Sequence, residues 1–210
     1  MTTITEQIIW VFTAMCPLVV CLVARDQLKT IMPQSALIIA VPEAEPVVAD
    51  FRERFDPAAH SGVPAHITVL FPFMSPKWLD AGVLERLRAV AAGRPAFSFQ
   101  MKRIGRFPNI LYLKPEPAAP FIAMTEALCA QFPDFPPYEG QFEEIIPHLT
   151  VANGHNAQLN RIEADLRASS TLRSGINAHC KQIALIENST GRWVTKKQFL
   201  LATTPSSGKI

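Results

Sequence analysis

Short apolar runs alternate with amphipathic stretches along most of the chain. Apolar or β-branched runs bounded by proline or glycine are too short for helices and predict buried strands. Apolar residues that recur three and four positions apart predict helices with one buried face. The pattern predicts strands at 35–41, 66–71, 96–104, 110–114, 148–152, 176–187 and 193–201, and helices at 46–55, 79–93, 118–132 and around 159–166.

The order of these elements is not a strict alternation of strand and helix, which favours an α+β fold over a doubly wound one. Two halves are visible, because each contains one strand that opens with the same four-residue pattern. Such an internal repeat indicates duplication. We therefore expect a bilobal α+β fold, with two lobes of antiparallel sheet and flanking helices related by a pseudo-two-fold axis around a central cleft.

The stretch 8–24 carries no charge and has the minimum length, about 17 residues, for a membrane-spanning helix. A signal peptide is disfavoured because no lysine or arginine precedes the stretch. A membrane anchor would be kinked by Pro17, and Arg25 and Lys29 would hold the rest of the chain in the cytoplasm.

The third interpretation is that the natural protein starts at Met32, where the composition becomes that of an ordinary globular domain. We expect residues 1–31 to be an apolar N-terminal extension, either a mis-assigned start or an anchor. Residues 32–210 are expected to form a single bilobal domain, with no membrane partner.

Composition excludes several classes of protein. Hydrophobic residues make up 49% of the chain, which is too high a fraction for a disordered protein. The net charge of +2 is too small to attract long nucleic acids or membrane surfaces electrostatically. The 4 cysteines show neither CxxC spacing nor the density of a secreted disulfide scaffold. A reducing compartment, and hence a cytoplasmic location, is expected.

The repeated pattern is His66-Ile-Thr68-Val and His148-Leu-Thr150-Val. Side chains alternate between the two faces of a strand, so each histidine shares one face with its threonine while the aliphatic residues face a core. If the lobes pack about a pseudo-two-fold axis, two imidazoles and two hydroxyls converge. The competing structural interpretation is that the histidines satisfy polar groups and that the threonines are present for β-propensity.

Two imidazoles and two hydroxyls suit chemistry at a phosphodiester. Such a reaction needs a base at the attacking oxygen and an acid at the leaving oxygen, and imidazole titrates near neutral pH. Hydroxyl groups can donate hydrogen bonds to the non-bridging phosphate oxygens. No HxH, HExxH or Cys/His cluster supplies closely spaced ligands, so we expect no metal, and we expect no cofactor.

These motifs resemble those of the 2H phosphoesterases, the superfamily of 2'-5' RNA ligases and cyclic phosphodiesterases. The resemblance covers about residue 32 to the end and includes GRFPNILYL and PPYEGQFEEIIPHLTVA. It implies an enzyme that acts on 2',3'-cyclic phosphate RNA ends, 2'-5' linkages or cyclic nucleotides. It also implies His148 as the base that activates water and His66 as the acid, although near-symmetry allows these roles to exchange.

Three further residues are candidates for substrate binding. Tyr138 lies between prolines and a glycine, Arg106 in a turn before the second strand of a hairpin, and Phe73 just after the first motif. Aromatic rings can stack on bases and arginine can bind phosphate. The expected partner is a short RNA end or a cyclic nucleotide, and the protein is expected to be a monomer. The alternative to an enzyme is a non-catalytic module that binds nucleotide or RNA phosphates.

Overall fold

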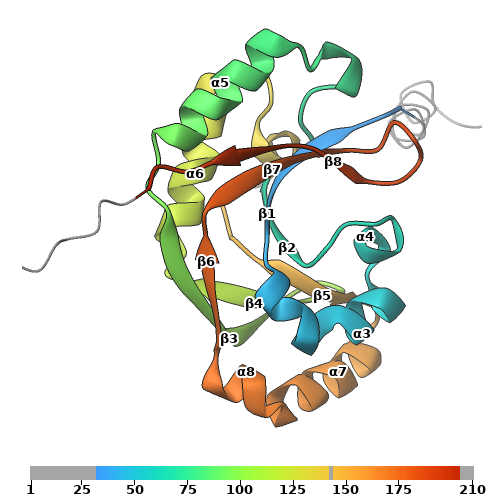
Figure 1. Cartoon of the computed structure of the whole chain (residues 1–210). Helices are drawn as coiled ribbons and strands as arrows, with labels where there is room; N and C mark the ends of the chain where they lie inside the picture. Colours follow the sequence, from blue (N-terminus) through green and yellow to red (C-terminus); the bar gives the residue numbers. More distant parts are fainter. Residues whose placement is uncertain (1–31, 142–143, 204–210) are drawn as a thin grey trace, which may run out of the picture. The chain divides into compact units, whose positions relative to one another are not determined.

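A computed structural model describes residues 32–141 and 144–203 (Figure 1). The apolar extension expected at 1–31 lies outside the described residues. Within the described part of the chain, no helix combines the length and the apolar character needed to cross a bilayer.

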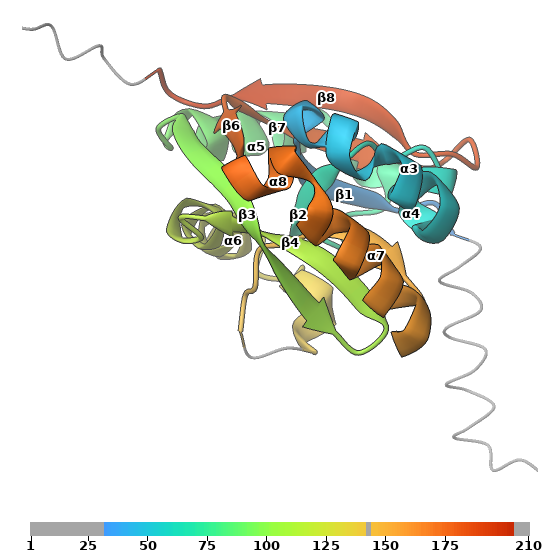
Figure 2. The ribbon, with the colours of Figure 1, turned by 90° about the horizontal axis from the view of Figure 1, so that it is seen from below.

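The described strands form two four-stranded antiparallel sheets. The first sheet has the order β2-β1-β7-β8, and the second has the order β5-β4-β3-β6. The strands β3 and β4 form a long hairpin that Figure 2 shows along its length. The bounds of the first sheet's strands are β2 His66–Leu70, β1 Ser35–Ala40, β7 Gln182–Glu187 and β8 Val194–Leu200; those of the second are β5 Leu149–Asn153, β4 Ile110–Glu116, β3 Phe97–Phe107 and β6 Ile176–Cys180.

Four longer helices accompany the sheets among the described residues. Local sequence explains their ends: α5 begins where the Asp80 carboxylate accepts a hydrogen bond from the Val83 backbone N–H, an N-cap of the usual kind. The helix predicted around 159–166 buries Leu159, Ile162 and Leu166, which recur at helical spacing and form one face. The long helices are α3 Glu45–Phe55, α5 Ala81–Ala92, α6 Ala119–Gln131 and α7 Asn156–Ala168; the short ones are α4 Pro57–His60, α8 Ser170–Ser174, η1 Pro42–Ala44, η2 Pro76–Trp78 and η3 Pro137–Gly140.

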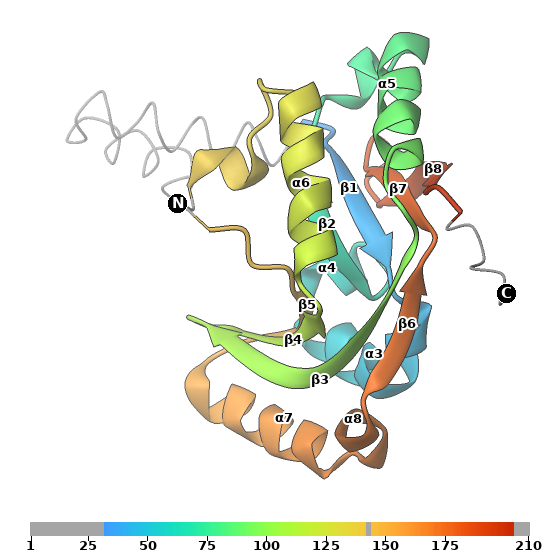
Figure 3. The same ribbon diagram turned by 90° about the vertical axis from the view of Figure 1, so that its left-hand side faces the viewer.

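The two halves are related by a pseudo-two-fold axis, and each half contributes one helix that packs against the sheet of the other. Helix α3, which follows β1, packs against β5 of the second sheet, and α6, which follows β4, packs against β2 of the first sheet. Figure 3 shows α6 in front of β2. The edge strands β2 and β5 also contact each other, so the two motif-bearing strands meet. The predicted two-lobed α+β fold is confirmed.

The stretch 176–187 differs from its prediction as a single strand. It divides at Lys181 into β6, which belongs to the second sheet, and β7, which belongs to the first. The alternation of apolar and polar residues carries no turn signal there, so the sequence pattern could not indicate the change of sheet. This crossing links the two sheets in addition to the helices that they exchange.

Candidate active site

The two repeated motifs open strands whose side chains alternate as predicted. Ile67 and Val69 are buried in the main core, whereas His66 and Thr68 are half-buried on the other face of β2. In the second motif, His148 immediately precedes β5 and is half-buried like Thr150. The burial of Leu149 and Val151 fixes this strand in the same way. Each histidine therefore shares an accessible face with its threonine.

The structure brings the two histidines together. Their strands are neighbouring edge strands, and a positive charge on His148 is close enough to lower the pKa of His66. The sequence predicted this convergence only on the assumption that the lobes pack about a pseudo-two-fold axis. The exchange of α3 and α6 between the sheets is the packing that produces it.

Both imidazoles are held by the same backbone contact. The His66 Nδ1 lies 2.8 Å from the Pro64 carbonyl oxygen, and the His148 Nδ1 lies 2.7 Å from the Ile146 carbonyl oxygen. A carbonyl oxygen can only accept, so Nδ1 donates its proton in both rings, and the neutral tautomer leaves a lone pair on Nε2. Two oriented rings with available Nε2 atoms can take up and deliver a proton at one substrate.

A buried ion pair lies behind His66. The Arg52 guanidinium on α3 donates to Asp56 at 3.0 Å and to the Val63 carbonyl at 3.1 Å, and Asp56 accepts from the Ala58 backbone N–H. Arg52 and Asp56 are only 2% and 3% exposed. The pair thus fixes the segment that leads into His66. This ion pair was not predicted from the sequence, although the i, i+4 spacing of opposite charges on a helix was a visible signal.

The neighbours of His148 are aromatic rings, whereas His66 lies near a buried ion pair. The rings of Phe107 and Tyr112 stack on each other at 4.4 Å, and their centroids lie 5.1 and 5.3 Å from that of the imidazole. Gly105 is required for this arrangement, because a side-chain carbon at that position would collide with the Tyr112 ring. Neither ring was predicted from the sequence as part of the site. Alternation along the predicted strands would have placed Tyr112 on one face but not next to His148.

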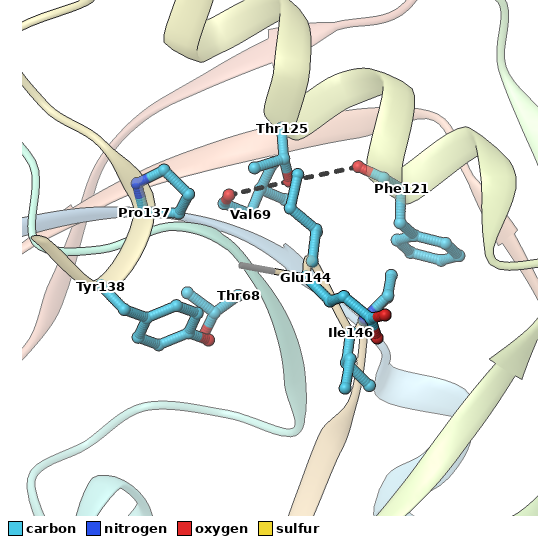
Figure 4. Close-up of a pocket in the computed structure, with 10 residues that line it drawn as sticks. Thr68, Val69, Phe121, Thr125, Pro137, Tyr138, Glu144 and Ile146 are labelled. Atoms are coloured by element: carbon cyan, nitrogen blue, oxygen red, sulfur yellow. Dashed lines mark hydrogen bonds between the residues drawn. The ribbon is translucent and has the colours of Figure 1, made fainter. Parts of the chain in front are cut away.

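Tyr138 lies beside the first motif. Its hydroxyl is hydrogen-bonded to that of Thr68, and Figure 4 shows the phenol ring directed toward this threonine. Its backbone has φ = 50° and its N–H donates to the Phe71 carbonyl at 2.6 Å. Both residues line a small pocket with Glu144 and Thr125. Of the three substrate-binding candidates, Tyr138 is the one that contacts a motif residue.

The other two candidates lie elsewhere. The strand β3 continues through Arg106, whose neighbour Phe107 faces His148, so Arg106 points to the opposite side. There its guanidinium donates to Glu163 and Asn160 on α7. Phe73 is only 5% exposed and packs edge-on against two other phenylalanine rings in the core. Both residues therefore have partners in the fold away from the two histidine motifs, and neither contacts a motif residue in the way that Tyr138 does.

The electrostatics of the site favour neutral imidazoles. Burial lowers the pKa of His66 to about 4, and the positive charge of Arg52 acts in the same direction, whereas the hydrogen bond to Pro64 opposes both. Burial also lowers the pKa of His148. An anion that binds between the rings would favour their charged forms and raise both pKa values.

These shifts predict a pH dependence for any reaction in which one imidazole acts as the base and the other as the acid. The profile of kcat/KM would then report the pKa values of the free protein, and turnover would need one neutral and one protonated imidazole. Because both free pKa values lie below 6.5, we expect a bell-shaped kcat/KM profile with its optimum below pH 6.5. The kcat profile should be displaced to higher pH by the bound anion. An optimum of kcat/KM above pH 7.5 would contradict the assigned environment of the histidines.

No group of three or more His, Cys, Asp or Glu side chains that could hold a metal ion occurs within residues 32–141 and 144–203.

Two cysteines lie in this part of the chain. Cys129 is half-buried and Cys180 is buried, and burial raises the pKa of both thiols. Neither is near the histidine motifs in the sequence or suited to act as a thiolate nucleophile.

Known proteins resemble this chain in sequence or in fold. A protein of Bacillus pumilus (strain SAFR-032) named "Putative phosphoesterase" is 28% identical over 125 residues, which is 58% of this chain and 70% of that protein. Among solved structures, Escherichia coli LigT complexed with NADP+ superposes with a TM-score of 0.50 at 19% identity and covers 81% of this chain and 99% of its own. A Thermus thermophilus protein gives a TM-score of 0.53 at 18% identity, with 81% and 98% covered.

The structural likenesses concern the fold, because their sequence identities are low. The family itself is shown by the sequence. The profile of the 2'-5' RNA ligase superfamily matches residues 40–192, a range that contains both histidine motifs, Tyr138 and the rings around His148. The chain therefore belongs to the 2'-5' RNA ligase superfamily, the 2H phosphoesterases.

Proposed function

We propose that the protein is a metal-independent phosphodiesterase that acts on 2',3'-cyclic phosphate RNA ends, 2'-5' linkages or related cyclic nucleotide phosphates. The observation that carries the proposal is the pair of half-buried imidazoles on neighbouring edge strands, each held through Nδ1 by a backbone carbonyl. Membership of the superfamily supports phosphodiester chemistry. Escherichia coli LigT, whose fold is similar, has been solved with 3'-AMP, which supports a nucleotide as the ligand.

In the proposed reaction, water attacks the phosphorus of a cyclic phosphate. The His148 Nε2 takes the proton from the water as the new P–O bond forms, and the His66 Nε2–H gives its proton to the ribose oxygen as the old P–O bond breaks. The product is a nucleoside phosphomonoester. Thr68 and Thr150 donate hydrogen bonds to the non-bridging oxygens, where negative charge builds up. Proton exchange with solvent restores the two rings.

The assignment of His66 as the acid depends on the substrate's own charge. An imidazole with a pKa of about 4 is neutral at pH 7 in the empty site. Contact with the phosphate anion favours the imidazolium form and raises this pKa. His66 is therefore proposed to gain its proton as the substrate binds. It would then act as an acid only when a phosphate group is in contact with its ring. Tyr138 is proposed to orient the Thr68 hydroxyl toward the same phosphate through their hydrogen bond.

The experiment that tests this function is hydrolysis of a 2',3'-cyclic mononucleotide and of a 2'-5'-linked dinucleotide by the full chain in the presence of EDTA. We expect turnover of at least one of them, with the same rate before and after chelation. Binding of both compounds without turnover would reject the enzyme and support the nucleotide-binding module instead. Loss of activity on chelation would reject a metal-independent reaction.

A further inference from the structure

The two lobes differ on the faces that carry the motifs. On the first sheet, Ile38 lies opposite Thr68 on one side and Ala184 on the other. This face is closed by a second apolar cluster, because Val63 is buried against it and the half-buried Trp193 packs on it. Little of this face beyond the first motif is therefore available to a polar ligand.

The corresponding face of the second sheet presents polar side chains. Tyr112 lies opposite Thr150 in β5 and opposite Gly105 in β3, so these residues share the face of His148. Two residues further along β4, Lys114 lies on the same face and is exposed. Its partner in the hairpin register is Arg103, which forms an exposed ion pair with Glu116.

The Lys114 side chain extends from β4 over the neighbouring strand β3 and does not point away from the sheet. A side-chain carbon at Gly105 would come within 2.6 Å of the Lys114 Cε and would collide with the Tyr112 ring, so the lysine stem and the ring occupy the space above this glycine together. Among residues 32–141 and 144–203, Lys114 has no hydrogen-bond or ion-pair partner. The Lys114 stem thus lies next to the aromatic ring that contacts His148 and carries an ammonium group with no partner among the described residues.

We infer that Lys114 binds a second phosphate group of the substrate, beside the phosphate that the histidines cleave. This inference rests on the proposed function and deepens it. The substrate class becomes a nucleotide with two phosphates, which extends from the histidines over the face of β3 and β4. A cyclic mononucleotide without a further phosphate leaves this cation unused. The second phosphate could be a 5'-phosphate or the internucleotide phosphate of an RNA end, since the ammonium group recognises the charge that both share.

The test compares three substrates: adenosine 2',3'-cyclic phosphate, the same compound with a 5'-phosphate, and the dinucleotide ApA that ends in a 2',3'-cyclic phosphate. We expect at least one of the last two to have a kcat/KM about tenfold or more above the first, because a hydrogen bond to a charged group is worth that much. Which of the two is preferred identifies the source of the second phosphate. Lys114→Gln should remove this preference, mainly through KM, and Lys114→Arg should retain it.

Lys181→Gln is the matched control, since it also removes one exposed lysine but lies between β6 and β7. It should keep the preference of the unaltered protein. Equal use of the three substrates, or a preference that survives in Lys114→Gln, would overturn the inference while the phosphodiesterase stands. Absence of turnover with all three, and with the 2'-5'-linked dinucleotide, would instead reject the proposed function.

Discussion

Replacing either motif histidine with glutamine is expected to reduce kcat/KM for a cyclic phosphate by about 100- to 10,000-fold, the usual contribution of one general acid or base. Glutamine keeps a polar group of similar length but cannot exchange a proton near neutral pH. His66→Gln and His148→Gln should therefore bind substrate and turn it over slowly. The measurement is steady-state hydrolysis of a 2',3'-cyclic nucleotide by each purified variant, with thermal unfolding recorded to show that both are folded.

A variant that carries both His66→Gln and His148→Gln shows whether the two histidines act together or independently. If the two imidazoles serve one proton-transfer step, the second substitution adds little to the first, because groups that act as a unit are strongly non-additive. His179→Gln is the matched control, since His179 is exposed on β6 and its Nδ1 lies 2.9 Å from the Ser98 hydroxyl. Turnover in either motif variant close to that of the His179 variant would remove the histidines from the mechanism.

Arg52→Met is expected to cause the largest loss of stability. It removes the cation from a carboxylate that remains buried, at Asp56, and leaves the Val63 carbonyl without its donor. Breaking a buried ion pair by removing one partner costs about 3–5 kcal/mol. Chemical denaturation should show a drop in the free energy of unfolding of about that size. Activity should also fall, because the freed segment leads directly into His66.

The matched control is Arg88→Met on α5. Arg88 pairs with Glu85 across one helical turn, but their side chains are 54% and 65% exposed. Exposed pairs of this kind contribute less than about 1 kcal/mol. If the unfolding free energies of the Arg52 and Arg88 variants were equal, Arg52 would not be the buried anchor described here. Removing Asp56 as well should restore part of the lost stability, since no lone buried charge then remains.

The parts of the fold that local periodicity determines were predictable. Alternation placed His66 and Thr68 on one face of a strand, and the repeat of the same pattern around His148 indicated a duplicated fold. The structure adds the reason for their meeting, which is the exchange of α3 and α6 between the two sheets. That exchange involves contacts between segments far apart in sequence, which no local pattern encodes.

The aromatic rings of the site show where prediction from sequence ends. Tyr112 reaches His148 because the β4–β5 register shifts between Leu111 and Tyr112, which sets Tyr112 opposite Thr150. Nothing in the sequence marks this irregularity. Arg106 differs from its prediction for a related reason: β3 continues through Gly105, Arg106 and Phe107, so a residue expected in a turn lies in a strand and faces α7.

The most direct measurement of the central claim is an NMR titration of the full chain, labelled with 15N-histidine, by inorganic phosphate. The Nε2 resonances are assigned with His66→Gln and His148→Gln. If one anion binds between the two rings, both Nε2 signals should shift toward the protonated form with the same half-saturating phosphate concentration. A response of only one ring, or two separate midpoints, would contradict a shared phosphate site.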